Sequence, residues 1–217
     1  MKKIVLMAII SILLNSCSIP YDLETRYIIE TKLVDSNGNA VSNEKIEVYV
    51  DANNSGETIS SSISDENGYI RMIFPKPDVE NFTISVNNTT NSINGFLNKN
   101  IYNIKQDNFI DYKLVLDEIK LVKFDELVDL IIEINQTSQD KELRKIEVIG
   151  EIYNQYEYLN PIQTSNNYYE LQTYFNLLKN QSFTLRYYVY NYTTMLLEES
   201  NVNLNIAEQS LNYTLTY

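Results

Sequence analysis

The chain has no histidine and only one cysteine among its 217 residues. Histidine is the commonest general base at neutral pH and the commonest metal ligand. Its absence excludes Ser-His-Asp and Cys-His nucleophile systems and histidine-rich zinc sites. A single cysteine, Cys17, cannot form a disulfide within the chain, so an oxidising compartment would not cross-link the fold. The sequence therefore predicts no cofactor and no metal centre, and it favours a protein that is not an enzyme.

Glycine, proline and basic residues are also scarce. Five glycines and four prolines argue against long flexible linkers. The 17 Lys and Arg are outnumbered by 29 Asp and Glu, which gives a formal net charge of −12. A nucleic-acid surface needs clustered Lys and Arg, so this balance argues against nucleic acid and against an extended face on anionic lipid.

The first residues have the pattern of an export leader. Lys2 and Lys3 precede an apolar run over residues 4–14, and the small residue Ser16 precedes Cys17. The run is too short to span a bilayer as a helix, which takes about 20 residues. We expect a cleaved signal peptide over residues 1–16. The alternatives are an uncleaved, buried thiol and an ordinary signal cut beside Cys17.

The sequence Leu14-Asn15-Ser16-Cys17 resembles the lipobox of bacterial lipoproteins, in which the cysteine thiol takes up a diacylglycerol. Asn15 departs from the small or aliphatic residue that is common at its position. The resemblance implies lipidation of Cys17, a membrane attachment through that lipid, and a tether over residues 17–26. Ser18 is not the aspartate that retains many lipoproteins at the inner membrane. The resemblance therefore implies the outer membrane of a cell envelope, on its periplasmic or its surface face.

Apolar and polar residues alternate from Tyr27 onward in short runs separated by turn signals, which is typical of half-buried strands. Residues 127–134 fit a helix or a strand, and their β-branched content favours a strand. Many short strands without helices between them predict an all-β fold of two tandem immunoglobulin-like antiparallel sandwiches, over residues 27–118 and 119–217. The apolar runs of the first half are Tyr27, Ile29 and Leu33; Ile46, Val48 and Val50; Ile70, Met72 and Phe74; and Phe82, Ile84 and Val86.

Two turns give the first half a family resemblance. Asp35-Ser36-Asn37-Gly38 follows the first run, and Ser64-Asp65-Glu66-Asn67-Gly68-Tyr69 precedes the third. This order of strands and Asx-Gly turns resembles the carboxypeptidase-regulatory-like domain, a transthyretin-like sandwich, over residues 27–116. Relatives often carry Thr-Asp where this chain has Ser64-Asp65. The resemblance implies a seven-stranded, non-catalytic adhesive or scaffolding module, and no comparable resemblance covers residues 119–217.

Tyrosine is concentrated in the second half, most densely around residues 187–192. Strand parity predicts that Tyr188 and Tyr190 face away from the core, with Arg186 on the same outer face. Exposed aromatic rings beside a cation can stack on sugars or anchor a protein partner. The candidate contact residues are therefore Arg186, Tyr188, Tyr190 and Tyr192. The alternative is that these tyrosines serve only cross-strand pairing and packing.

Together these features predict a lipid-anchored, non-catalytic binding or structural module at the bacterial cell envelope, as an accessory subunit of an outer-membrane or surface protein complex. A glycan-binding surface lipoprotein that uses the tyrosine-rich second sandwich is the alternative. An enzyme that acts through carboxylates alone is a third class. Oxygen atoms near two turns offer ligands for calcium, but no EF-hand spacing is present and ordinary turn chemistry explains them better; they belong to Asp51, Asn53, Asp65, Glu66 and Asn67.

Overall fold

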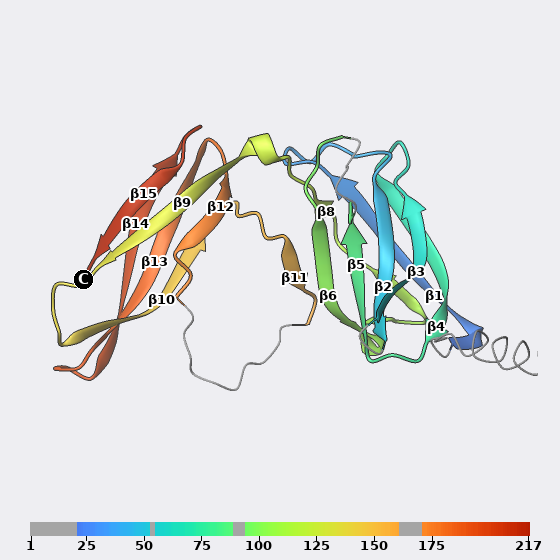
Figure 1. The fold of residues 1–217 in the computed structure, drawn as a ribbon, viewed down its shortest axis with the longest axis horizontal. Coiled ribbons are helices and arrows are strands. Elements are labelled where there is room, and N and C mark those ends of the chain that lie inside the picture. Colours follow the sequence, from blue (N-terminus) through green and yellow to red (C-terminus); the bar gives the residue numbers. More distant parts are fainter. Residues whose placement is uncertain (1–20, 53–54, 89–93, 161–170) are drawn as a thin grey trace, which may run out of the picture.

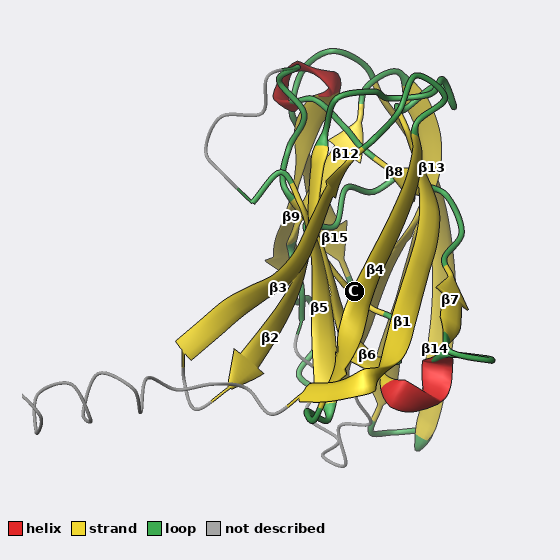
Figure 2. Cartoon of the chain, turned by 90° about the vertical axis from the view of Figure 1, so that its right-hand side faces the viewer, coloured by secondary structure: helices red, strands yellow, loops and turns green. Residues whose placement is uncertain are grey.

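A computed structural model describes residues 21–52, 55–88, 94–160 and 171–217 (Figure 1). Over these ranges the chain is all-β, as the alternation predicted, and two short 3-10 turns are the only helical segments (red in Figure 2). No helix in the described part of the chain is long and apolar enough to cross a bilayer. The strands are β1 (Tyr21–Val34), β2 (Lys45–Ala52), β3 (Ser55–Ile63), β4 (Tyr69–Pro77), β5 (Asn81–Val86), β6 (Lys99–Lys105), β7 (Lys113–Val115), β8 (Ile119–Lys120), β9 (Leu127–Asn135), β10 (Lys141–Ile149), β11 (Tyr156–Tyr158), β12 (Tyr174–Leu178), β13 (Gln181–Asn191), β14 (Leu196–Ile206) and β15 (Leu211–Thr216).

Strands β1 to β8, together with β11, form a first sandwich of two sheets. One sheet has the order β4-β1-β7, with β8 also paired to β1, and the other has the order β11-β6-β5-β2-β3. The inward side chains of these strands make one continuous core. The four predicted apolar runs supply this core, and each of their members is at most 4% exposed. Burial of one face of every strand is the main stabilising term of such a sandwich.

The two Asx-Gly turns of the first sandwich have the same geometry. The side chain of Asp35 accepts hydrogen bonds from the backbone N–H groups of Asn37 (2.9 Å) and Asn39 (2.8 Å). That of Asp65 accepts from Asn67 (2.9 Å) and Tyr69 (2.8 Å) in the same way. Each turn contains a glycine at positive φ, +83° in the first turn and +74° in the second. The predicted turn chemistry therefore forms at both places.

The second sandwich consists of the sheets β10-β13-β14 and β12-β9-β15. Residues 127–134 lie in β9, so the strand interpretation of this ambiguous segment is confirmed. Its alternate residues Val128, Leu130 and Ile132 are at most 7% exposed and pack in a core that is separate from the first one. The fold class is therefore two β-sandwiches in one chain.

Two features differ from the sequence-based expectation. Strand β1 begins at Tyr21 rather than at Tyr27, because Tyr21 and Asp22 already pair with the end of β4 ahead of a register shift. Strand β11 lies between β10 and β12 in sequence, yet it pairs in parallel with β6 of the first sandwich. Strands β8 and β11 thus extend sheets of the first sandwich, although both follow residue 118. The boundary at residue 118 itself stays a prediction.

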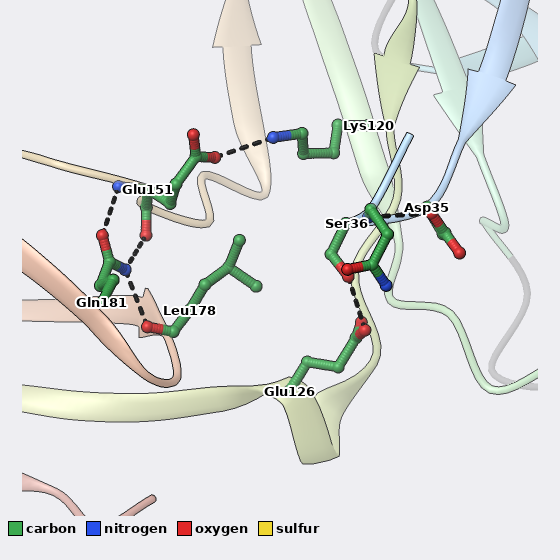
Figure 3. A network of polar contacts seen from close by, with 8 residues as sticks. Asp35, Ser36, Lys120, Glu126, Glu151, Leu178 and Gln181 are labelled. Carbon is green, nitrogen blue, oxygen red and sulfur yellow. Dashed lines mark hydrogen bonds and ion pairs between the residues drawn. The ribbon is translucent and has the colours of Figure 1, made fainter. Parts of the chain in front are cut away.

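Polar contacts hold the two sandwiches together where the chain passes between them (Figure 3). The Lys120 Nζ lies 2.8 Å from a carboxylate oxygen of Glu151. The hydroxyl of Ser36 donates to Glu126 at 2.7 Å. The Gln181 side chain accepts from the backbone N–H of Glu151 at 2.7 Å and donates to the carbonyl of Leu178 at 2.7 Å.

Candidate functional site

Strand β13 carries three of the four predicted contact residues on its outer face. Phe183 and Leu185 point into the core and are at most 3% exposed. Because successive side chains of a strand point to opposite faces, Arg186, Tyr188 and Tyr190 lie on the outer surface of the sheet. Their cross-strand neighbours in β10 and β14 are mostly charged or amide side chains. The predicted parity of β13 therefore agrees with its burial pattern.

The tyrosine rings are held by cations from the neighbouring strand β10. Lys145 Nζ lies 5.8 Å from the ring centre of Tyr188, and the guanidinium carbon of Arg144 lies 5.4 Å from that of Tyr190. A register shift at Arg144 interrupts the pairing with β13, which allows two consecutive cations to reach rings on one face. Tyr192 then packs edge-on against Tyr190 with ring centres 5.0 Å apart. Contacts of this kind contribute about 0.5–1 kcal/mol each at exposed sites.

Glu147 organises the middle of this face. It forms an ion pair with Lys145, lies 3.8 Å from Arg186 Nη1, and accepts from the Tyr188 hydroxyl at 3.4 Å. The hydrogen bond from Lys145, with the charges of Lys145 and Arg186, lowers the pKa of Glu147. Arg186 in turn donates to Asn201 of β14 at 3.1 Å. The central carboxylate is therefore ionised and fully engaged at neutral pH.

A second group of contacts fixes the end of the face. The Tyr192 hydroxyl donates to Glu142, and that hydrogen bond raises the pKa of Tyr192. Arg144 Nη2 lies 2.7 Å from Glu142 and donates to the Tyr192 oxygen at 3.1 Å. Tyr192 follows β13 in the turn toward β14 and remains 48% exposed. The ring is thus ordered by its hydroxyl, while its aromatic surface is open to solvent.

Charges of the two signs balance on this surface, which we call the tyrosine face. Its three cations are matched by three carboxylates, in a chain whose net charge is −12. A partner would therefore be recognised by the pattern of side chains and by aromatic contact rather than by a strong field of one sign. The tyrosine face comprises Glu142, Arg144, Lys145, Glu147, Arg186, Tyr188, Tyr190, Tyr192 and Glu199.

An apolar tip adjoins the tyrosine face at the turn between β13 and β14. Met195, Leu196 and Leu197 are 68%, 63% and 55% exposed. The Tyr190 hydroxyl lies 3.4 Å from the Met195 sulfur, which joins the tip to the face. Three consecutive exposed apolar residues at a hairpin end are unusual on a solvated surface. Sequence reasoning missed this tip, although an apolar triplet directly after a polar turn was a usable signal.

Sequence reasoning also missed the residues that hold the tyrosines, Glu142, Arg144 and Lys145. Their roles depend on the pairing of β10 with β13, which are about 40 residues apart, and on the bulge at Arg144. Alternation within β13 could not reveal either feature. The structure thus brings the three β13 residues and Tyr192 together on one surface, as expected, and adds their partners.

The remaining predicted sites fall elsewhere. Cys17 and the signal peptide over residues 1–16 lie outside the described residues, as does Asn53 among the calcium candidates. Asp65 uses its carboxylate within its own turn. Over the ranges that the structure describes, no group of three or more acidic or cysteine side chains is placed to hold a metal ion.

Comparisons with known proteins give likeness of fold at low similarity. No family profile and no curated protein sequence matches the chain. Among solved structures, a streptococcal ancillary pilin is 12% identical, with 88% of this chain and 61% of that chain covered and a TM-score of 0.32. The shaft pilin spaA from Lactobacillus rhamnosus GG is 10% identical, with 88% and 98% covered and a TM-score of 0.34. A 9R-lipoxygenase from Cyanothece PCC8801 is 19% identical, with 48% and 18% covered and a TM-score of 0.32. This chain thus spans only 18%, 33% and 61% of the first three matched chains, the second being the Bacillus anthracis TIE protein. At such scores the likeness carries no argument about function.

Proposed function

We propose that this chain is a non-catalytic binding module at the bacterial cell envelope, and that it contacts its partner through the tyrosine face of the second sandwich. The observation that carries the proposal is the ordering of Tyr188, Tyr190 and Tyr192 on the outer face by surrounding cations and hydrogen bonds, with Tyr188 and Tyr190 half-buried and Tyr192 exposed. Ordered aromatic rings lose little conformational entropy on binding, which is why tyrosine is favoured in binding surfaces.

A protein partner fits this surface better than a glycan. The tyrosine face continues into the apolar tip of Met195, Leu196 and Leu197, and burial of exposed apolar side chains is a typical gain of protein association. Tyr and Arg are the side chains most enriched among residues that dominate such interfaces. A glycan would use the rings as stacking platforms and would leave the apolar tip in water. The tip therefore favours an accessory subunit of an envelope protein complex over a glycan-binding lipoprotein.

The carboxylates of the tyrosine face are poorly suited to catalysis. A general acid at neutral pH needs a raised pKa, whereas the contacts of Glu147 lower its pKa. Glu142 accepts the Tyr192 hydroxyl and pairs with Arg144, so it is not free to activate a water. These engagements support a binding role over an enzyme that acts through carboxylates.

Attachment through a lipid on Cys17 completes the proposal and follows from the lipobox-like leader. Two or more acyl chains hold a protein at a membrane stably, without help from basic surface residues. Replacing Cys17 by Ser should move the protein from the membrane fraction to the soluble fraction. Unchanged fractionation of the Cys17→Ser protein would disprove the lipid attachment and leave the binding surface untouched.

The binding role is tested by a matched pair of variants. Tyr190→Ala combined with Tyr192→Ala removes two rings from the tyrosine face. Tyr174→Ala removes a ring from the opposite sheet that is as exposed as that of Tyr192. Proteins recovered from envelopes with the wild type should be lost with the double variant and retained with Tyr174→Ala. Equal recovery with all three proteins would refute the role of the face. Binding of the purified chain to a glycan array, lost in the same double variant, would favour the glycan alternative.

A further inference from the structure

Strand β14 forms an open edge of the second sandwich. It spans Leu196–Ile206 and pairs along its whole length with β13, in one continuous register without a bulge. No other described strand pairs with its opposite side. A long, regular edge of this kind presents a row of backbone donors and acceptors that can pair with a further strand.

Apart from β15, the other outer strands of the four sheets carry features that block such pairing. Strand β4 ends in Pro75 and Pro77. The pairing of β3 with β2 contains a register shift, and β10 has both a register shift and three cations. Strands β7, β8 and β11 contain only three, two and three residues. The outer side of β12 already accepts and donates hydrogen bonds with residues 151–153. Proline, bulges, charge, shortness and cover are the usual protections of a sheet edge.

Within the described part of the chain, β15 and the stretch of β14 after Glu199 lack these protections, and both strands lie on the side of the second sandwich away from the first (Figure 1). Residues 200–217, which include most of both strands, carry a single charged side chain, Glu208. In a chain of net charge −12, this side carries little charge that would repel a second copy. The side of the second sandwich with open strand edges is therefore also a side with little charge.

We propose that the β14–β15 side is a self-association surface, on which a second copy of this chain adds its β14 antiparallel to the first across a two-fold axis. An isologous contact requires a strand that is complementary to itself. If the two-fold axis passes through Asn201 or through Val202, each residue of one β14 opposes a residue of the other β14 whose side chain is on the same face of the sheet. Glu199 then opposes Asn203 or Asn205 of the second copy, and no glutamate opposes a glutamate.

The same pairing covers apolar surface that one copy leaves partly open. Val202 and Leu204 point toward the core and are only half-buried at this edge. In the register centred on Val202 they meet Val202 and Ser200 of the second copy, so the apolar layer continues across the contact. A two-fold axis perpendicular to the sheet also brings the neutral β15 strands near each other, and it directs the bodies of the two copies away from one another.

A matched pair of double variants tests the contact. Asn203→Glu with Asn205→Glu places acidic side chains on the open edge, where one of them opposes Glu199 of the second copy in either register. Ser182→Glu with Thr184→Glu is the control, because these residues are the cross-strand partners of Asn205 and Asn203 in the central strand β13. Both variants add the same charge and break the same side-chain hydrogen bonds. They differ only in the strand that bears the charge.

The measurement is the mass of the purified full chain by sedimentation equilibrium, in density-matched detergent, from micromolar to several hundred micromolar protein. The wild type and the β13 control should approach twice the monomer mass, with dissociation constants that agree within about twofold. In the β14 variant, two symmetry-related like-charge pairs should raise the dissociation constant of the dimer by about tenfold or more.

A wild type that stays monomeric throughout would overturn the proposal and leave the edge to a strand from another protein. Equal loss in the β13 control would also overturn it, because the sheet face rather than the edge would then be responsible. Circular dichroism checks that both variants are folded, and Asn203→Glu alone serves as a milder variant if the double variant is not.

Discussion

The segment around β11 ties the second sandwich to the first, and Lys99 makes two of its attachments. We call residues 153–160 the strap. The Lys99 side chain is only 8% exposed; its Nζ donates to the carbonyl of Asn154 at 2.8 Å and forms an ion pair with Glu157. Replacing Lys99 by Met keeps the aliphatic stem and removes both charge-assisted contacts. We expect the strap to open more often, while the two cores stay intact.

The size of the effect follows from the exposure of the partners. Hydrogen bonds to a charged group contribute about 1.5–3 kcal/mol each when both partners are buried. The Glu157 side chain is 51% exposed, so water solvates its carboxylate when the ion pair with Lys99 is removed and offsets part of the lost interaction. A net loss of about 2 kcal/mol in the free energy of strap opening remains, which corresponds to roughly 30-fold in an equilibrium constant.

Amide hydrogen exchange measures this opening directly. The N–H of Asn100 donates to the carbonyl of Gln155 at 2.8 Å, and that of Leu159 donates to Tyr102 at 3.0 Å. Both should exchange about 30-fold faster in Lys99→Met, if they exchange through local opening. Lys32→Met is the control, because the Lys32–Glu118 pair is exposed on both sides and contributes about 1 kcal/mol or less. Unchanged exchange at the two strap amides, or equal acceleration throughout both cores, would refute this reasoning.

Two further predictions concern a turn and a tyrosine. Gly68→Ala should cost clearly more than Gly38→Ala in the free energy of unfolding, since a Cβ at Gly68 would lie 2.4 Å from the carbonyl oxygen of Leu33, whereas the one at Gly38 meets open space. The shared penalty for positive φ is about 1 kcal/mol. Burial raises the pKa of Tyr153 to about 12, so the stability that Tyr153 contributes is present below the ordinary pKa of 10.0 and is lost as pH rises through about 12.

Urea denaturation checks both predictions. Equal losses for the two glycine variants would show that the close approach to Leu33 relaxes without cost. For Tyr153→Phe, the alkaline loss of stability should be shallower than in the wild type, because the buried hydroxyl that resists ionisation is gone. An unchanged alkaline slope would show that Tyr153 is not the group responsible. The hydroxyl also donates to the carbonyl of Asn98, so the variant should be less stable at neutral pH by about 1 kcal/mol.

Strands with one buried face could be predicted from sequence alone. Ile46, Val48 and Val50 alternate strictly with polar residues, and all three are completely buried. Strand β6 could not be placed, because its segment is rich in asparagine and its burial depends on a distant segment. As whole residues, Lys99 and Asn100 are each only 7% exposed, since the strap covers them. Composition within β6 contains no sign of that cover.

The tyrosine face was predictable in part, because side chains alternate along a regular strand. Parity within β13 was enough to place Arg186, Tyr188 and Tyr190 on the outer surface, because a regular strand alternates its side chains. The cations over the rings come from β10, and a bulge turns Arg144 toward Tyr190. Pairing between distant strands and irregular registers are set by the tertiary fold, so neither could be read from the local pattern.

The central claim is that the tyrosine face is the binding surface of this protein. Tyr192 and Tyr174 are both 48% exposed, but Tyr192 follows β13 of one sheet of the second sandwich and Tyr174 lies in β12 of the other, which makes them matched positions for a photo-crosslinking amino acid. Irradiation of cells should capture a defined partner from position 192 and none from position 174. Capture of the same species from both positions, or from position 174 alone, would contradict the claim.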